Sequence, residues 1–303
     1  MSQETKTEEA MPEVNAQLSY RDWLASTRMK AQLRPLTEQE LARPYAKFYR
    51  EPATPDPAAM AMMDKPCDSE KALYPDQIND LLDPGYLNVE TGWCVLPNGA
   101  GFVAYCEHYD DITPAMIDWW FAWHCLEDLR YRIWYPTHHA GILVSPDTRR
   151  RILDPYIPVR EKNWGATHHV TENVGGVMEN IDITFLSPQD FGFDMKRWKE
   201  PGVATFAGGY GWRSPVERSE QSITSAALMC HFFRIVPGGL EHRARFWMGY
   251  RISNGEPELT LPQGVAIPAS SVQGLAYHTV SEFKNLSVLL PELYREFGGR
   301  MTA

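Results

Sequence analysis

A long amphipathic segment near the C-terminus, from Val272 to Phe297, constrains the fold of this chain more than any other stretch. His278 and Glu282 lie within it four residues apart, which places them one turn from each other on the same side of a helix. The apolar residues of the segment recur at helical spacing and form a stripe close to this pair: Leu275, Val280, Phe283, Leu286, Leu289, Leu290, Leu293 and Phe297. We therefore predict an amphipathic helix that turns His278 and Glu282 toward the protein interior.

The pair of His278 and Glu282 allows two interpretations. An inward-facing imidazole and carboxylate need a partner, and one bound metal ion would satisfy both side chains. A His–Glu pair on a half-exposed helix surface would instead contribute only roughly 0.2–0.5 kcal/mol. Further ligands elsewhere in the chain would favour the metal ion.

The composition is typical of a globular protein and argues against several classes of partner. Apolar residues make up 44% and charged residues 22% of the 303 residues, which suits one large domain or one domain with a smaller attachment. The net charge of −10 argues against nucleic acid or an anionic membrane as the main partner. No apolar run approaches the roughly 20 residues that span a membrane, and residues 1–13 lack the apolar core of a secretory signal.

The cysteines are scattered and form no CxxC pair. The five positions are Cys67, Cys94, Cys106, Cys125 and Cys230. Such spacing is typical of reduced thiols and not of a disulfide framework or a cysteine zinc site. We therefore expect a cytoplasmic protein.

Residues 1–77 are expected to form a small N-terminal helical extension. Residues 1–16 have few apolar anchors, residues 19–49 show a helical pattern, and the proline-rich stretch from Pro52 to Pro66 is typical of an extended arm. Several apolar side chains of this region need to be buried: Trp23, Leu24, Leu41, Tyr45 and Phe48. We therefore predict a homodimer in which the extension packs on a second subunit, with a flexible extension that lacks a partner as the alternative.

Residues 78–303 are expected to form the main domain, of the α+β class. Two apolar runs flank Pro97-Asn98-Gly99 and predict a hairpin over residues 92–105, because Asn-Gly readily forms tight turns. A helix is predicted to begin at Thr113-Pro114 and to run to about Leu129. Strands are predicted at residues 131–134, 166–173, 181–185, 203–210, 226–235 and 241–251. This order indicates a curved antiparallel sheet wrapped around the closing helix, with a cavity between them.

Histidines and carboxylates on separate predicted elements could meet in that cavity. His124 follows a run of aromatic residues, and a buried core histidine is its alternative interpretation. His168 and Glu172 share one face of a predicted strand, and His169 and Thr171 share the other. Either face could point inward, although an inward-facing Glu172 needs a cation. Together with His278 and Glu282, these residues offer nitrogen and oxygen donors without sulfur, a set that suits Zn²⁺.

Aromatic residues make up 12% of the chain, with ten tryptophans, and several of them cluster around Trp120 and Trp123. A large core accounts for most of these residues. An enclosed pocket for a flat ligand would use the same residue types. Trp120 and Trp123 are therefore candidate substrate contacts.

Four stretches of the chain resemble the 2,4-diacetylphloroglucinol hydrolase family and occur in the same order. They are Trp119–His124, Thr167–Gly176, Pro237–Gly249 and the closing pair of His278 and Glu282. The resemblance spans about residues 78–297. It implies a Bet v 1-like fold, in which a curved antiparallel sheet grips a long C-terminal helix after a smaller N-terminal dimerisation region.

The resemblance also implies a metal site and a reaction. Members of the family bind Zn²⁺ through two His and two Glu, and they hydrolyse a carbon–carbon bond between an acyl group and a phenolic ring. The ligands carried over to this chain are His124, Glu172, His278 and Glu282. Glu161 is the rival of Glu172 and a candidate catalytic carboxylate. Glu127 stands one turn after the helix His, where the family has an Asn that helps to hold the substrate, so substrate preference could differ.

We therefore expect a zinc-dependent hydrolase that acts on a small aromatic ketone, an acylated phenol. Zn²⁺ lowers the pKa of bound water toward about 7 and polarises the acyl carbonyl, and polar side chains would hold the ring hydroxyls. His168, His231 and Tyr210 are candidates for that role, whereas His138 and His139 lie in a predicted loop and are assigned none. The alternatives are a non-catalytic carrier that uses the same cavity and a zinc hydrolase of another bond, such as an ester or a lactone.

Overall fold

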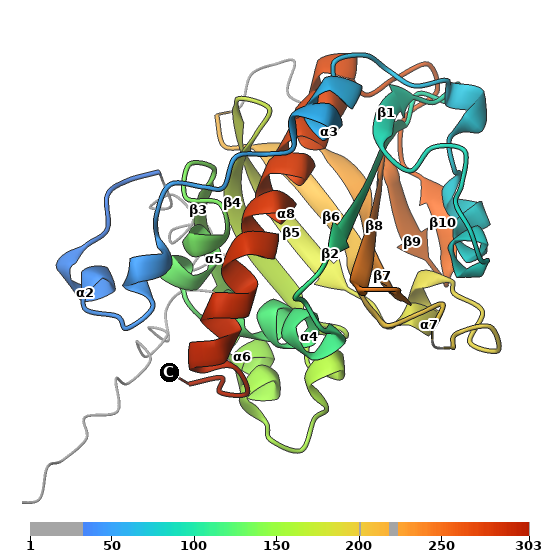
Figure 1. Cartoon of the computed structure of the whole chain (residues 1–303). Helices are drawn as coiled ribbons and strands as arrows, with labels where there is room; N and C mark the ends of the chain where they lie inside the picture. The colour runs from blue at the N-terminus through green and yellow to red at the C-terminus, as the bar shows by residue number, and fades with distance from the viewer. Residues whose placement is uncertain (1–32, 200, 218–223, 303) are drawn as a thin grey trace, which may run out of the picture.

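The computed structural model describes residues 33–199, 201–217 and 224–302, which form a large antiparallel sheet with a long helix across one face. The helix is α8 (Ala269–Phe297), and it runs diagonally over the sheet in Figure 1. The eight strands of the sheet lie in the order β1-β2-β8-β7-β6-β5-β4-β3. Trp23 and Leu24, two of the residues expected to need burial, lie outside the described residues.

The strands of the large sheet are β1 (Gly92–Val95), β2 (Gly101–Tyr109), β3 (His139–Val144), β4 (Thr167–Val174), β5 (Val177–Phe185), β6 (Thr205–Pro215), β7 (Ser225–Val236) and β8 (Gly239–Met248). A separate two-stranded sheet consists of β9 (Tyr250–Ser253) and β10 (Glu256–Leu259). The α-helices before α8 are α2 (Glu38–Leu41), α3 (Pro57–Met62), α4 (Pro114–Trp123), α5 (Asp128–Trp134), α6 (Pro146–Leu153) and α7 (Pro188–Phe191). The 3₁₀ helices are η1 (Ala46–Phe48), η2 (Ser69–Lys71), η3 (Pro75–Leu82), η4 (His124–Leu126) and η5 (Val159–Glu161). No helix within the described ranges is long and apolar enough to cross a membrane.

The expected α+β class is confirmed, and the antiparallel sheet with its closing C-terminal helix is the arrangement expected for a Bet v 1-like fold. The predicted hairpin is also present, as β1 and β2. Gly99 in its turn has a φ of +87°, and a Cβ atom there would collide with the Val265 carbonyl oxygen. The turn therefore requires glycine at this position.

Residues 131–134, predicted as a strand, form the second half of α5 instead. Every residue of α5 from Leu129 to Trp134 is buried. A helix buried on all sides shows no apolar stripe in the sequence, so a short one resembles a strand. The strand of this region follows the helix as β3, which the sequence did not indicate.

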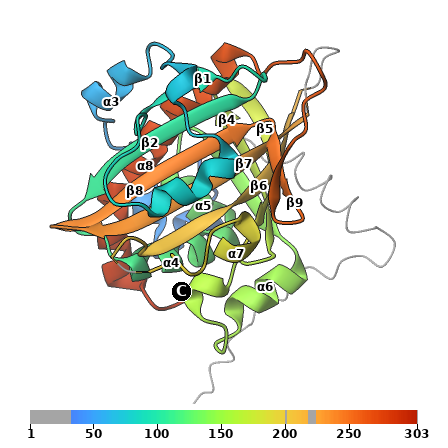
Figure 2. The same ribbon diagram turned by 90° about the vertical axis from the view of Figure 1, so that its right-hand side faces the viewer.

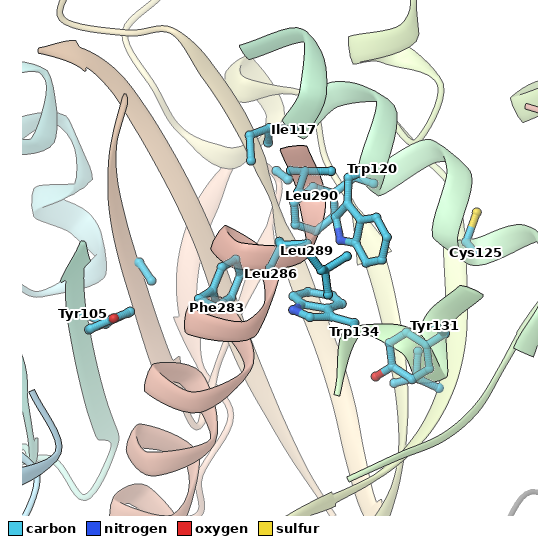
Figure 3. Close-up of a cluster of buried hydrophobic side chains, with 14 of the residues drawn as sticks. Tyr105, Ile117, Trp120, Cys125, Tyr131, Trp134, Phe283, Leu286, Leu289 and Leu290 are labelled. Carbon is cyan, nitrogen blue, oxygen red and sulfur yellow. The ribbon is translucent and has the colours of Figure 1, made fainter. Parts of the chain in front are cut away.

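The inner face of the sheet packs against α8. Phe283, Leu286 and Leu289 of this helix are almost completely buried, and full burial of one such side chain contributes roughly 1.5–3 kcal/mol. Trp134 of α5 meets Phe283 edge to face, with 5.3 Å between the ring centroids (Figure 3). The sheet and the neighbouring helices α4 and α5 thus hold α8 from two sides.

The outer face of the sheet is covered by the chain that precedes β1, which lies in front of β8 in Figure 2. Trp247 of β8 donates a hydrogen bond from its indole N–H to the Leu73 carbonyl oxygen at 2.7 Å. Glu90 pairs with both Arg243 and Arg245, each at 2.5 Å. These ion pairs belong to the outer face, which leaves the inner face free for the cavity described below.

The described part of the N-terminal extension, residues 33–77, packs on the main domain of its own chain. Its arm, with α3, crosses the N-terminal half of α8 (Figure 1). Tyr45 and Phe48 are buried, with ring centroids 5.9 and 6.4 Å from that of Phe297 in α8. Leu41 stays exposed, with 62% of its surface accessible. The burial of Tyr45 and Phe48 therefore requires no second subunit, and the homodimer stays a prediction.

Candidate active site

A cavity lies between α8 and the inner face of the sheet. Its polar lining includes four histidines, two glutamates, a tyrosine and an arginine: His124, His168, His231, His278, Glu172, Glu282, Tyr131 and Arg213. Most of the remaining wall is apolar, as in pockets that bind small organic molecules.

Four side chains converge at one end of this region. One donor atom from each of His139, Glu172 and His278 lies within 4.8 Å of the other two. Glu282 Oε2 lies 3.5 Å from His139 Nε2 and 3.6 Å from His278 Nε2. Glu172 Oε2 lies 3.3 Å from His139 Nε2. Ligands about 2.0 Å from a tetrahedral Zn²⁺ would be roughly 3.3 Å apart, so these separations suit a shared ion.

A β-bulge places His139 in this group. His139 and Glu172 face each other across the antiparallel pair of β3 and β4. The register shifts between His139 and Gly141, so β3 carries one extra residue at this point. A bulge re-aims the side chain beside it, and here it puts His139 instead of Ala140 opposite Glu172.

Two glycines let the hairpin of β4 and β5 approach α8. A Cβ atom added to Gly274 of α8 would lie 2.6 Å from the Cα atom of Gly175 in the hairpin turn. Beside this contact, His278 Nδ1 lies 3.1 Å from the Asn173 carbonyl oxygen. The close approach therefore brings Glu172, on the strand, next to His278, on the helix.

The backbone holds the second ring nitrogen of both histidines in the group. His139 Nδ1 lies 3.1 Å from the Tyr131 carbonyl oxygen, just as His278 Nδ1 contacts that of Asn173. In the neutral rings Nδ1 donates to these carbonyls, so each Nε2 presents a lone pair to the group. Both Nε2 atoms are buried and lack a hydrogen-bond partner among the residues that the structure describes. Tyr131 also donates its hydroxyl to Glu172, and its ring stacks on His139 with 4.0 Å between centroids.

The carboxylates make this end of the cavity favourable for positive charge. Burial alone would raise the pKa of Glu282, but His278 and His139 outweigh it and lower that pKa to about 2. Burial alone would lower the pKa of His278, whereas Glu282 and Glu172 raise it above its ordinary value. The group therefore stabilises a positive charge at its centre, whether a proton or a metal ion.

Three other histidines of the cavity wall are neutral. Burial lowers the pKa of His231 to about 4 and that of His124 to about 3. Burial also places the pKa of His168 well below its ordinary value. These imidazoles are uncharged near pH 7 and can offer a ligand hydrogen bonds but no charge.

The sequence-based choice of His124 as a metal ligand is not supported by this geometry. His124 follows α4 and lines the cavity, but the converging group found among the described residues contains His139 in its place. His124 Nδ1 lies 2.8 Å from the Trp120 carbonyl oxygen, and its ring stacks on the Trp120 indole. These contacts agree with its alternative interpretation as a buried histidine.

Two glutamates expected at the site lie elsewhere. Glu161 ends η5 and is not among the described residues that line the cavity, whereas Glu172 is. Glu127 precedes α5, accepts a hydrogen bond from the Tyr45 hydroxyl and pairs with Arg130 at 3.2 Å. Its carboxylate therefore ties the N-terminal extension to the main domain and does not face the cavity.

The remaining candidates divide into two sets. His168 and His231 line the cavity, as a role toward a ring hydroxyl requires. Tyr210 packs against the outer core, because alternate residues of β6 face opposite sides of the sheet. Trp120 and Trp123 are fully buried and do not belong to the described cavity wall. Tyr210, Trp120 and Trp123 are therefore not among the described residues that line the cavity.

His139 is the candidate ligand that the sequence patterns did not reveal. A strand predicted at residues 131–134 leaves His139 in a loop. One signal was available, because the apolar run from Ala140 to Val144 directly follows His139 and is typical of a buried strand. The bulge that turns His139 inward depends on the pairing of β3 with β4, so no local sequence pattern predicts it.

Comparison with known proteins identifies relatives over most of the chain. Residues 73–295 match a family model described as the DAPG hydrolase PhiG domain. A phloretin hydrolase from Eubacterium ramulus is 34% identical over 272 residues, which cover 86% of this chain and 92% of that protein. A 2,4-diacetylphloroglucinol hydrolase from Pseudomonas protegens is 29% identical over 269 residues, which cover 84% of this chain and 85% of that protein.

Two solved structures show a more distant likeness. The crystal structure of Ara h 8.0201 covers 64% of this chain and 99% of its own, with 9% identity and a TM-score of 0.37. The structure of an uncharacterised protein from Rhizobium leguminosarum covers 64% of this chain and 95% of its own, with 15% identity and a TM-score of 0.34.

Proposed function

The chain belongs to the DAPG hydrolase family, and on this premise we propose that it is a zinc-dependent hydrolase that removes an acyl group from a phenolic ring of the phloroglucinol type. The relatives are named for phloretin and 2,4-diacetylphloroglucinol. In both molecules an acyl carbon is bonded directly to a trihydroxylated ring, so hydrolysis at that position breaks a carbon–carbon bond. The observation that carries the proposal is the convergence of His139, Glu172, His278 and Glu282.

The converging group fits Zn²⁺ by the chemistry of its donors. Two buried Nε2 atoms, which have no hydrogen-bond partner within the described ranges, and two carboxylates form a nitrogen–oxygen set that suits this ion. His139 and His278 would bind through Nε2, and Glu172 and Glu282 through a carboxylate oxygen each. When bound, Zn²⁺ supplies Lewis acidity toward the acyl carbonyl and lowers the pKa of a water molecule to about 7.

The reaction sets the demands on the rest of the cavity. Water adds to the acyl carbon, and the bond from that carbon to the ring breaks. The electron pair stays with the ring and is delocalised onto its oxygens, and the ring carbon then takes up a proton. Hydrogen-bond donors placed at the ring oxygens therefore stabilise the charge that develops during cleavage.

His168 and His231 are in place to meet this demand. Both line the cavity, and burial keeps both rings neutral near pH 7. A neutral imidazole can donate a hydrogen bond without repelling a nearby cation. The Tyr131 hydroxyl is already engaged with Glu172, so we assign Tyr131 the orientation of that carboxylate.

Elemental analysis of the purified full-length protein, together with a product assay, tests the proposal. We expect about one Zn²⁺ per chain and release of phloroglucinol from an acylphloroglucinol, followed by chromatography. Removal of the ion by a chelator should stop release, and added Zn²⁺ should restore it. A zinc-free protein that stays active would overturn the metal assignment. A zinc-loaded protein that binds the substrate without cleaving it would instead be a carrier, and cleavage of esters or lactones alone would indicate another bond.

A further inference from the structure

A hydrogen-bonded chain of three buried residues leads from the cavity wall into the core. His231 of β7 belongs to the cavity wall, and its Nδ1 lies 3.1 Å from Nε2 of His242 on β8. His242 Nδ1 lies 3.0 Å from the hydroxyl oxygen of Tyr109 at the end of β2. The strands β2, β8 and β7 are neighbours in the sheet, so this chain crosses three strands.

The surroundings of the chain are apolar. The His242 ring stacks on that of Phe233 with 4.5 Å between centroids, and Phe283 of α8 lies 4.3 Å from it. Burial lowers the pKa of His231 to about 4 and keeps the pKa of His242 well below its ordinary value. Both imidazoles are therefore neutral near pH 7, and each carries one N–H and one lone pair.

The need of each buried polar atom for a hydrogen-bond partner fixes which atom donates in each of these two hydrogen bonds. In the part of the protein that the structure describes, the Tyr109 hydroxyl has no other hydrogen-bond partner, so it donates to His242 Nδ1. Neutral His242 then carries its proton on Nε2 and donates to His231 Nδ1. His231 in turn carries its proton on Nε2, the nitrogen that is not tied to His242. The reverse direction would leave the hydroxyl proton of Tyr109 buried without an acceptor, which is unfavourable.

We propose that Tyr109 and His242 are positioning residues, which hold His231 in the Nε2–H tautomer as a fixed, neutral hydrogen-bond donor to the cavity. The role of this donor rests on the proposed function: it binds the ring oxygen that becomes negative when the acyl–ring bond breaks. The three hydrogen-bonded side chains orient a proton and do not relay one. A relay would leave a buried tyrosinate, and burial raises the pKa of Tyr109 well above its ordinary value.

Nitrogen-15 NMR of histidine-labelled, zinc-loaded full-length protein tests the tautomer without any substrate. The His231 signals are assigned by their loss in His231→Gln. We expect a protonated-type shift for Nε2 and a lone-pair-type shift for Nδ1. In Tyr109→Phe the fixed direction is lost, so the two shifts should move toward a tautomer average. An Nδ1–H pattern for His231 in the unsubstituted protein would overturn the proposal, whatever the enzyme acts on.

Kinetics test the effect of this orientation. Tyr109→Phe should lower kcat about tenfold, as loss of an outer positioning partner typically does. KM should change less than about threefold, because the hydrogen bond from His231 to the ring oxygen strengthens only in the transition state. His242→Leu should lower kcat to a similar degree. His242→Gln keeps an amide donor and acceptor, so it should retain kcat within about threefold. Unchanged kcat in both Tyr109→Phe and His242→Leu would overturn the proposal.

Tyr105→Phe is the matched control for a general loss of packing. Tyr105 is also buried on β2, its hydroxyl interacts with Glu107, and it takes part in neither of the two hydrogen bonds that join Tyr109, His242 and His231. We expect kcat and zinc content to be unchanged in this variant. Equal losses of kcat in Tyr105→Phe and Tyr109→Phe that follow their melting temperatures would reduce Tyr109 to a structural role and overturn the proposal. Absence of cleavage by the unsubstituted, zinc-loaded protein would refute the proposed function, while the NMR measurement would still decide the tautomer.

Discussion

His278 and His231 are buried histidines of the same cavity, yet their surroundings shift their pKa values in opposite directions. Glu282 and Glu172 raise the pKa of His278 against the effect of burial. His231 has another imidazole as its hydrogen-bond partner, and burial lowers its pKa to about 4. The comparison shows that the placement of carboxylates, more than burial, decides which histidines of a cavity favour a cation.

The two environments suit the two halves of an acylated phenol. The charged group of His139, Glu172, His278 and Glu282 favours a cation, which is where an acyl carbonyl would be polarised. The neutral wall around His231 offers hydrogen bonds without charge, which suits ring oxygens. A positive charge at the neutral wall would also repel the ion at the other end. The cavity therefore has one end suited to the acyl carbonyl and a wall suited to the ring oxygens.

The largest effect on zinc affinity and turnover is expected from removing the His139 side chain, because it is one of four proposed ligands of a single ion. His139→Ala should lower zinc affinity and turnover by at least about 100-fold, beyond the loss typical of outer-shell partners. His124→Ala is the matched control, since it removes another buried histidine near the same cavity and should keep its zinc. Metal-to-protein ratios after dialysis provide the measurement. Full zinc in His139→Ala together with an empty His124→Ala would restore His124 as the ligand.

A second experiment separates the two glutamates that the sequence left as rivals. Glu172→Gln keeps the size of the side chain but removes the charge that offsets Zn²⁺, so zinc affinity and turnover should fall together by roughly 100-fold. Glu161→Gln should leave both unchanged, because Glu161 lies outside the cavity wall. Titration of each metal-free variant with Zn²⁺ measures the affinities. The assignment fails if Glu161→Gln loses zinc and Glu172→Gln keeps it.

A smaller effect is expected from separating α8 from the hairpin of β4 and β5. Gly274→Ala adds a Cβ atom against Gly175, so the helix and hairpin must shift apart. We expect zinc affinity to fall about tenfold, the size of an orientation defect. Alanine favours a helix over glycine by up to about 1 kcal/mol, so a loss of helix stability would not explain that result. Ser271→Ala, one turn earlier, is the control, and equal zinc affinity in both variants would contradict the proposed role of the contact.

The smallest effect is expected on the pH dependence of stability, to which the neutral histidines of the cavity wall contribute. The pKa values of about 4 for His231 and about 3 for His124 lie below the value of about 6.5 in an unfolded chain. In that interval the unfolded chain binds more protons, so the free energy of unfolding decreases as the pH falls from about 6.5 toward 4. His231→Gln should flatten this slope by at most about 1.4 kcal/mol per pH unit. Denaturant titrations of metal-free protein at several pH values provide the measurement, and an unchanged slope would argue against a neutral His231.

The sequence by itself determined the closing helix and the two site residues that it carries. His278 and Glu282 are related by one helical turn, and that relation holds wherever the helix packs. Glu172 could be predicted in the same way, because strand alternation sets the side of the sheet on which it lies. The curved sheet around the helix also followed from the order of predicted elements. In each case the information is local, since the backbone geometry of one element fixes it.

Only the tertiary structure decided how residues of different elements meet. His139 reaches Glu172 through a bulge that exists only when β3 pairs with β4, and a shift of one residue would turn its side chain to the other face. The approach of Gly175 to Gly274 and the chain from Tyr109 through His242 to His231 likewise join segments far apart in the sequence. Periodicity reports the direction of a side chain within its own element. The position of that element relative to its neighbours is set by packing, which no local pattern records.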